Sequence, residues 1–147
     1  MSKNKEITNA AAVLLADSYA LYLKTHNYHW NVTGPMFNSL HTMFEVQYDE
    51  LALAVDEVAE RIKALGAYAP GSFSEFAALT SLDEAVQGAK AVEMIEQLAA
   101  DQLKVVAAAQ ALGRIADAAG DDVTTDLAIR RQEVHQKNAW MLRSHLD

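Results

Sequence analysis

The sequence predicts an all-α protein, built as a single bundle of four long helices with one long crossover connection. Hydrophobic residues make up 51% of the 147 residues, many of them alanine, and there are only six glycines and two prolines. This composition favours helix over sheet. Apolar residues recur at spacings of three, four and seven, as on one face of a helix. The chain is also long enough to bury a core of its own.

The first predicted helix begins near Thr8 or Asn9, which are both favourable N-cap residues, and runs to about Asn31. Residues 1–7 are therefore expected to form a short N-terminal tail. The Thr-Gly-Pro segment at 33–35 ends this helix, and its proline is well suited to opening the next one.

The second predicted helix runs from about Met36 to Leu65, and Gly66 is expected to follow its C-terminus. One face of this helix is apolar, and its members are Phe37, Leu40, Phe44, Leu51, Val55, Val58, Ile62 and Leu65. Such a stripe predicts an amphipathic helix that packs on the core with one side.

Residues 67–88 lack a helical pattern and form the predicted crossover. Two Ser-x-x-Glu patterns lie within it, at 72–75 and 81–84, and both are typical of capping boxes. A short helix is expected over Phe73–Leu79, lying across the bundle.

The third long helix is predicted from about Ala89 to Ala119. Asp121 or Asp122 is expected to cap the fourth, which continues almost to the C-terminus. The sequence has no internal repeat and no low-complexity tail. Four long helices with one long crossover predict a ferritin-like bundle that forms a single domain over residues 1–147.

Composition and charge restrict the function. A formal charge of −8 and a pI near 5.0 argue against binding nucleic acid through a broad basic surface, and suit a protein that concentrates cations. The chain has no cysteine, which excludes a disulfide framework, a zinc knuckle and a thiol nucleophile, and fits the cytoplasm. We see neither the apolar region of a secretory signal nor a run of about 18 apolar residues that predicts a membrane span.

Two polar pairs on the second helix are the strongest indication of chemistry. His41 with Glu45, and Asp56 with Glu60, are each spaced i, i+4, so the side chains of each pair share one face. Imidazole and carboxylate groups are suited to iron, manganese or zinc. Fifteen residues separate His41 from Asp56, which is about 22 Å of helix. The two pairs therefore cannot share a metal ion within one chain.

On a helical wheel, both pairs lie to one side of the apolar stripe and face away from the interior of their own bundle. Tyr48, Ala52 and Ala59 share this flank, and the two alanines would let another helix approach closely. An antiparallel two-fold contact between second helices would bring the 41/45 end of one chain opposite the 56/60 end of the other. Such a contact creates two identical sites.

His29, near the end of the first helix, can join His41 and Glu45 in such a site. Two imidazoles and three carboxylates suit one or two iron ions. The sequence contains no Glu-x-x-His, the pattern that ferritin-type sites inside a bundle need on two helices. A di-iron site of that kind within one chain is therefore not expected.

Purely structural interpretations stand beside this hypothesis. Asp56 and Glu60 can form a solvated helix face, with Arg61 and Lys63 as neutralising neighbours. His29 can be an ordinary half-buried histidine. Other aromatic and imidazole side chains are interpreted as packing or structural residues: His26, Tyr28, Trp30, Tyr48 and His135.

At these residues the chain resembles the Dps family, the mini-ferritins also called DNA-protection-during-starvation proteins, over nearly its whole length. The longest matching segment is Thr-His-Asn-Tyr-His-Trp-Asn-Val-Thr-Gly-Pro-Met-Phe at 25–37, followed by Leu40-His41 and by Asp-Glu-Val-Ala-Glu-Arg-Ile at 56–62. The family signature is a His-Trp dipeptide, a second histidine twelve residues on, and an Asp-x-x-x-Glu pair fifteen residues later. In this sequence the signature residues are His29, Trp30, His41, Asp56 and Glu60.

The resemblance implies a spherical shell of twelve chains with an iron-oxidation centre at each two-fold interface. The ligands that it implies are His29, His41, Glu45, Asp56 and Glu60. Trp30 matches the family tryptophan beside the centre, where it can trap stray oxidising equivalents. Glu45 departs from the family, in which aspartate is frequent here. Its longer arm still reaches the site, where it can also ligate through water.

The resemblance further implies that hydrogen peroxide oxidises Fe(II), with oxygen slower, and that a ferric mineral collects in the cavity. Family members have acidic pores at three-fold axes near the start of the fourth helix, where this chain has Asp121, Asp122 and Asp126. Asp122 and Asp126 are spaced i, i+4 and can line one pore wall. The alternative for these aspartates is N-capping and compensation of the helix dipole.

Family members that bind DNA usually do so with a flexible basic tail. This chain offers only Lys3 and Lys5 before its first helix, and its C-terminus has no basic extension. Twelve copies of a chain with a formal charge of −8 should repel phosphate. We therefore expect weak or absent DNA binding.

Taken together, these observations predict an iron-oxidising, iron-storing mini-ferritin, a cytoplasmic ferroxidase that forms a homododecamer and protects against oxidative stress. One alternative is a structural shell that binds DNA and has little ferroxidase activity. Another is a zinc- or manganese-binding bundle with no redox role.

Overall fold

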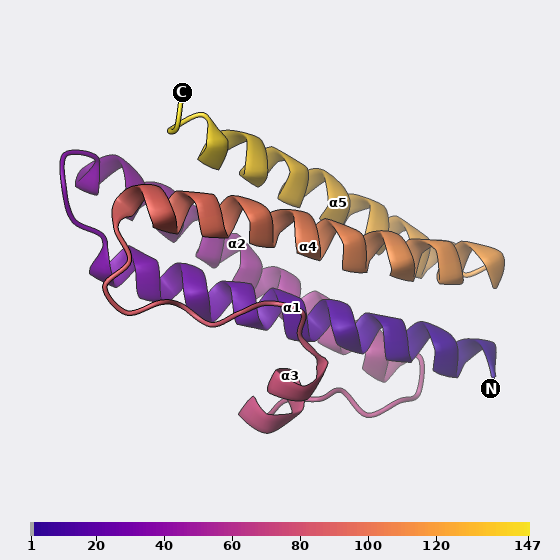
Figure 1. Ribbon diagram of the computed structural model, residues 1–147. Helices are drawn as coiled ribbons and strands as arrows, with labels where there is room; N and C mark the ends of the chain where they lie inside the picture. Colours follow the sequence, from indigo (N-terminus) through magenta and orange to yellow (C-terminus); the bar gives the residue numbers. More distant parts are fainter. Residues whose placement is uncertain (1) are drawn as a thin grey trace.

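The computed structural model describes residues 2–147 and contains, over that range, helices and irregular connections without strands. Four long helices form an elongated bundle, and one short helix lies outside it beside the first helix (Figure 1). In chain order the elements are α1 (Lys3–Asn31), α2 (Phe37–Ala64), α3 (Phe73–Leu79), α4 (Ala91–Ala118) and α5 (Asp122–Arg143). The predicted ferritin-like bundle with a short helix in its crossover is confirmed.

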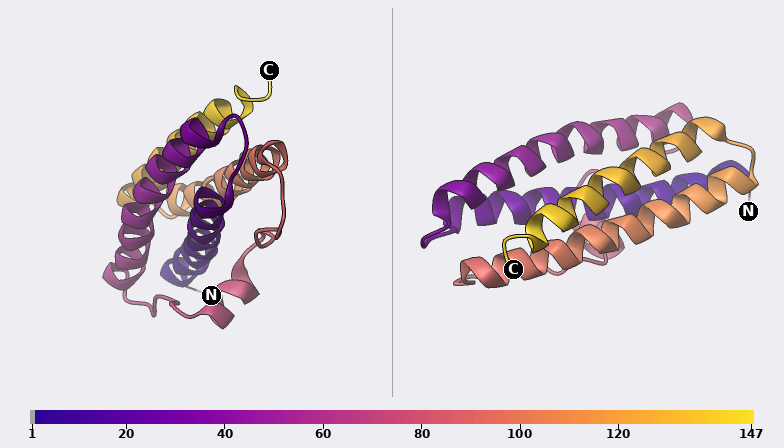
Figure 2. Two further views of the ribbon diagram at one scale, coloured as in Figure 1. Left: turned by 90° about the vertical axis from the view of Figure 1, so that its left-hand side faces the viewer. Right: turned by 90° about the horizontal axis from the view of Figure 1, so that it is seen from above.

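The long helices form two antiparallel hairpins, α1 with α2 and α4 with α5, which pack against each other (Figures 1 and 2). The connection between the hairpins passes through α3 and runs back along the bundle, so α2 and α4 point the same way (Figure 1). This single long crossover leaves one flank of α2 at the surface.

Most of the predicted α2 stripe lies in the core. Leu40, Phe44, Leu51, Val58 and Ile62 are fully buried. Phe37, in the first turn, is instead 42% exposed, and its ring stacks on His41 with centroids 5.0 Å apart. The flank that carries His41 is therefore partly aromatic as well as polar.

The first helix begins five residues earlier than predicted, so the expected tail is helical from Lys3 onward. The Ser2 hydroxyl caps this end by accepting a hydrogen bond from the Lys5 amide at 3.2 Å. Glu6 in the first turn complements the helix dipole. Ile7 is 1% exposed, and its burial holds this turn against the core.

In the crossover, the first predicted capping box is confirmed. The Ser72 hydroxyl accepts from the Glu75 amide at 3.3 Å and donates to the Glu75 carboxylate at 2.9 Å, and α3 begins there. Hydrogen bonds from the Gly71 amide and the Ser72 hydroxyl lower the pKa of Glu75.

The second predicted capping box, at Ser81 and Glu84, is wrong. The Ser81 amide and hydroxyl donate to the carboxylate of Asp17 on α1, at 2.7 and 3.2 Å, and the segment stays irregular. The next helix begins at Ala91, where the Glu93 carboxylate accepts from the Lys90 amide at 2.9 Å. A long-range partner has thus replaced a local cap.

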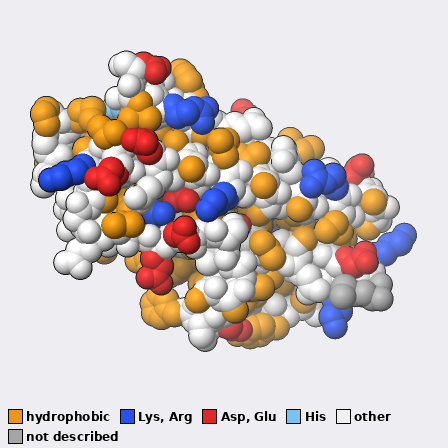
Figure 3. Space-filling view, in the orientation of Figure 1, with side chains coloured by type: hydrophobic (Ala, Val, Ile, Leu, Met, Phe, Trp, Pro, Cys, Tyr) orange, Lys and Arg blue, Asp and Glu red, His pale blue; other side chains and the backbone are white. Residues whose placement is uncertain are grey.

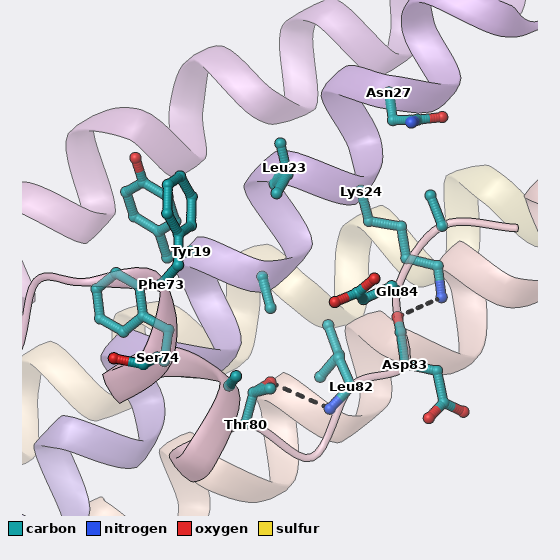
Figure 4. A pocket seen from close by; sticks show the side chains of 14 residues that line it. Tyr19, Leu23, Lys24, Asn27, Phe73, Ser74, Thr80, Leu82, Asp83 and Glu84 are labelled. Carbon is teal, nitrogen blue, oxygen red and sulfur yellow. Dashed lines mark hydrogen bonds between the residues drawn. The ribbon is translucent and has the colours of Figure 1, made fainter.

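Lys24 of α1 makes a second attachment between α1 and the crossover. Its ammonium donates to the Asp83 carbonyl at 3.0 Å (Figure 4). It also pairs with Asp101 of α4 at 2.8 Å. Burial raises the pKa of Asp101, although Lys24 opposes this. Beside these contacts, α1, α3 and the crossover border a cavity of about 510 Å³ that is open to solvent. Tyr19 and Phe73 line part of it (Figure 4).

None of the helices between residues 2 and 147 combines the length and the apolar character that crossing a membrane requires.

Candidate metal centre

His29 and His41 lie face to face where α1 and α2 meet, with ring centroids 3.7 Å apart and planes inclined by 15°. The Nδ1 atom of each ring lies 2.7 Å from the backbone oxygen of the other residue. Because a carbonyl oxygen only accepts, each Nδ1 carries the hydrogen, and each Nε2 keeps a lone pair for a metal ion.

The local fold explains why these hydrogen bonds form. The His29 carbonyl belongs to the last turn of α1, where carbonyl groups lack partners within the helix. The short connection at residues 32–36 brings the second turn of α2 back beside it. The His41 carbonyl has two lone pairs and can accept the imidazole as well as a helical amide. The two rings are therefore oriented by the backbone before a metal binds.

Glu45 lies one turn after His41 on α2. One of its carboxylate oxygens is 3.8 Å from His29 Nε2, and the Glu45 side chain is 52% exposed whereas that of His29 is 8% exposed. The carboxylate and the His29 nitrogen thus face the same region. Even so, residues 2–147 of a single chain contain no group of three histidine or acidic side chains placed to hold a metal ion.

Asp56 and Glu60 form a second polar pair further along the same helix, and both are exposed. A hydrogen bond with the Asp56 side chain raises the pKa of Glu60, and the charge of Asp56 adds to this effect. The two carboxyl groups therefore lie beside each other on the surface of α2. Arg61 does not neutralise them, since its guanidinium donates to Thr124 at 2.9 Å and pairs with Asp121 at 3.1 Å.

The surface beside Asp56 is open and carries two alanines of α2. A cavity of about 450 Å³ lies there, bounded by Ala52 and Ala59 of α2 and by Ser72 and Phe73 at the start of α3. Ala52 is exposed and Ala59 is partly buried. Ala52 and Ala59 thus lie at an open part of the α2 surface, and their place in a contact between two chains stays a prediction.

Trp30 and His26 lie beside the histidine pair. The His26 ring contacts Trp30 at 3.9 Å and Tyr48 at 4.3 Å between centroids, and Tyr48 meets His29 edge-on at 5.2 Å. Burial raises the pKa of Tyr48, and the charges of Glu45 and Asp49 add to this. Sequence reasoning gave His26 no role, although its spacing of four from Trp30 was a usable signal.

His135, by contrast, is a structural residue. It is fully buried, with Nδ1 2.6 Å from the Gln102 side-chain oxygen and Nε2 3.0 Å from the Arg131 guanidinium. Burial, and then the charge of Arg131, lower its pKa to about 3. It is therefore uncharged at neutral pH and bound within the core of the bundle.

The three aspartates near the start of α5 differ in their surroundings. Asp121 is the N-cap: it accepts from the Thr124 amide at 3.0 Å and pairs with Arg61. Burial raises the pKa of Asp121, but the hydrogen bonds from Thr124 and the charge of Arg61 outweigh it, and the pKa is lowered. Asp122 is exposed, and Asp126 pairs with Arg130 at 2.9 Å. Asp121 thus has the capping role, and pore lining stays a prediction for all three.

Comparison with known proteins gives a consistent result. The family described as Ferritin-like domain matches residues 10–147. DNA protection during starvation protein 2 of Bacillus anthracis is 35% identical over 144 residues, which cover 98% of this chain and 99% of that protein.

Two crystal structures show the likeness in three dimensions. Dps from Staphylococcus aureus superposes with a TM-score of 0.95 at 36% identity, covering 100% of this chain and 99% of that one. Dps from Vibrio cholerae O1, described as a member of a broad superfamily of ferritin-like diiron-carboxylate proteins, superposes with a TM-score of 0.94 at 30% identity, covering 99% and 92%.

Proposed function

Because this chain belongs to the Dps family of ferritin-like proteins, we propose that it oxidises Fe(II) at centres shared between two chains and stores the ferric product. One observation carries the proposal. The reciprocal hydrogen bonds of His29 and His41 leave two Nε2 lone pairs available at the surface flank of α2, where one chain supplies too few ligands to complete a site.

In the proposed centre, His29, His41 and Glu45 of one chain face Asp56 and Glu60 of the partner subunit. The two α2 helices cross antiparallel, with the small side chains of Ala52 and Ala59 at the contact. A two-fold axis makes the two resulting centres identical. This arrangement gives each metal pair two imidazoles and three carboxylates, a set suited to iron.

The chemistry follows from this ligand set. Two Fe(II) ions give one electron each to hydrogen peroxide, whose oxygen–oxygen bond breaks, and two protons are taken up to form two waters. The carboxylates stabilise the additional positive charge of the ferric product. The hydrogen bond with Asp56 and its charge raise the pKa of Glu60, and a cation bound by both carboxylates offsets their repulsion.

Storage requires assembly beyond the dimer. We propose a shell of twelve chains, whose interior collects ferric mineral, with Asp122 and Asp126 as candidate lining of the iron entry. The formal charge of −8 per chain draws cations towards such a shell. Arg130 partly neutralises Asp126, so Asp122 is the freer carboxylate of the two.

An anaerobic Fe(II) titration of the sized oligomer, followed by peroxide, tests this function. Ultraviolet absorbance of ferric product should grow in the unmodified protein and should be lost in His41→Ala and in Asp56→Ala. His145→Ala is a matched control, because that histidine lies near the C-terminus, bonded to the Met141 carbonyl. Absence of absorbance growth in the unmodified protein would favour a zinc- or manganese-binding role, or a DNA-binding shell, over the ferroxidase.

A further inference from the structure

A row of aromatic rings extends from the candidate metal centre along α1. Its members on α1 follow spacings of three, four and four, which place them on one helix face: Tyr19, Tyr22, His26 and Trp30. Tyr48 of α2 inserts between them. None of these rings is fully buried, and Trp30 is 58% exposed.

The ring contacts are continuous. Trp30 contacts His26, and His26 contacts Tyr48. Tyr48 in turn lies 5.9 Å from Tyr22, and Tyr22 lies 5.7 Å from Tyr19, measured between ring centroids. It begins beside the metal ligands, where Tyr48 meets His29. It ends at Tyr19, which lines the 510 Å³ cavity beside α3 (Figure 4).

We propose that these rings relay single oxidising equivalents from the metal centre to Tyr19, with His26 as the positioning residue that holds Trp30 and Tyr48 together. Indole and phenol are readily oxidised by one electron, and each ring here lies within contact of the next. The inference rests on the proposed function, because peroxide supplies the equivalents.

The relay supplies the second electron when peroxide reacts at a centre that holds only one Fe(II). Peroxide needs two electrons, of which the metal gives one and a tyrosine phenol gives the other, losing its proton. The products are one Fe(III), one phenoxyl radical and two waters, with one further proton taken from solution. At Tyr19 the phenoxyl regains a hydrogen atom from a small donor of the enediol class that reaches the cavity. The alternative fate, a hydroxyl radical beside His29 and His41, is thereby avoided.

Azide radicals, which oxidise tryptophan in preference to tyrosine at neutral pH, test the relay without iron. In a Trp140→Phe background, Trp30 is the only tryptophan. The indolyl absorbance should decay, independently of protein concentration, as phenoxyl absorbance grows. In this step the phenol gives an electron and a proton, and the indolyl radical takes up both.

Matched variants locate the path. Tyr48→Phe keeps the ring but removes the phenol next to His26, and His26→Leu removes the bridging ring; each should slow the transfer at least tenfold, whereas His26→Phe should restore it. Tyr68→Phe is the control, because Tyr68 is 71% exposed and bonded to Glu75. Unchanged transfer in both Tyr48→Phe and His26→Leu would overturn the relay.

A second measurement uses the iron reaction itself. With one Fe(II) per site followed by peroxide, frozen samples should show a phenoxyl signal by electron paramagnetic resonance, and ascorbate should remove it faster in the unmodified protein than in Tyr19→Phe. Iron oxidation at full loading should stay within about twofold in Tyr48→Phe, since each electron then comes from Fe(II). Loss of iron oxidation in the unmodified protein would reject the proposed function, whereas the azide result would still decide whether the relay exists.

Discussion

At the scale of single residues, hydrogen bonds to two backbone carbonyls determine how His29 and His41 can act. Each ring donates through Nδ1 at 2.7 Å, which directs each Nε2 away from the backbone. A metal-bound histidine normally makes such a bond through its other nitrogen, and the bond fixes tautomer and orientation. The sequence predicted that these residues meet, but it could not give their tautomers, because those depend on the turn geometry between α1 and α2.

The raised pKa of Glu60 makes the stability of the metal-free protein depend on pH. Because Asp56 raises its pKa, Glu60 binds a proton more readily in the folded chain than in the unfolded chain. Stability from this pair is therefore present at low pH and is lost as the pH rises through the raised pKa. Glu60→Gln should raise the thermal midpoint of the metal-free protein at neutral pH, and the gain should shrink in acid. The same variant should lose at least about tenfold in iron oxidation rate.

Glu57→Gln provides the control for Glu60, one turn away on the same helix. Glu57 pairs with Arg130 at 2.6 Å, so its loss should not raise the thermal midpoint and should leave iron oxidation close to normal. Calorimetry across a pH series would measure both variants. A midpoint of Glu60→Gln at or below that of the unmodified protein at neutral pH would contradict the repulsion between Asp56 and Glu60.

At the scale of elements, local sequence patterns correctly predicted those helix ends whose hydrogen-bond partners lie nearby in the chain. The Ser72–Glu75 box opens α3 because its partners lie within one turn. The same pattern at Ser81 failed, because Asp17, 64 residues earlier, offers that amide a buried carboxylate. The early start of α1 likewise depends on burial of Ile7. Periodicity therefore predicted the long helices well, whereas connections with long-range partners needed the structure.

The attachment of the crossover can be tested at Asp17. This carboxylate is 1% exposed and accepts hydrogen bonds from the Thr80 hydroxyl and from the Ser81 amide and hydroxyl. Asp17→Ala should cost about 3 kcal/mol in the free energy of unfolding, since it leaves buried donors without a partner. Urea unfolding measures the cost, and hydrogen exchange should show faster exchange at the Ser81 amide.

Glu84→Ala is the matched control for Asp17, because Glu84 belongs to the capping pattern that does not form. It is exposed and lies at the rim of the cavity beside α1 (Figure 4). Its replacement should change the free energy of unfolding by less than about 0.5 kcal/mol. Equal destabilisation by both variants would show that the crossover is held by its local sequence rather than by α1.

At the scale of the whole molecule, the distribution of charge argues against the DNA binding that the family name suggests. Acidic and basic side chains are interspersed with apolar ones on the face seen in Figure 3, over a chain whose formal charge is −8. Lys3 and Lys5 lie in the first turn of α1 rather than in a tail. We therefore predict weak or absent binding of supercoiled DNA at neutral pH and moderate salt. A mobility shift that persists above ordinary salt would contradict this, and its loss in Lys3→Glu with Lys5→Glu would assign the binding to these two lysines.

The incomplete site is also a property of the whole molecule. Spacing on α2 predicted two separate polar pairs, and the structure keeps them on one open flank, with no group of three metal-binding side chains in residues 2–147. The distances between the His41/Glu45 pair of one chain and the Asp56/Glu60 pair of another depend on how two α2 helices pack. A single chain therefore could not give them. Two inactive variants, each lacking a different half of the centre, can decide whether the two polar pairs meet across an interface.

The decisive measurement is the iron oxidation rate of hybrid oligomers made from His41→Ala and Asp56→Ala chains. In a mixed two-fold pair, one centre loses both halves and the other keeps both. Random equal mixing makes half of the pairs mixed, so about one quarter of the centres should be active. A centre shared between two chains predicts about a quarter of the unmodified rate in hybrids verified by mass. A rate equal to the mean of the two parents, in oligomers shown to be mixed, would contradict a centre shared between chains.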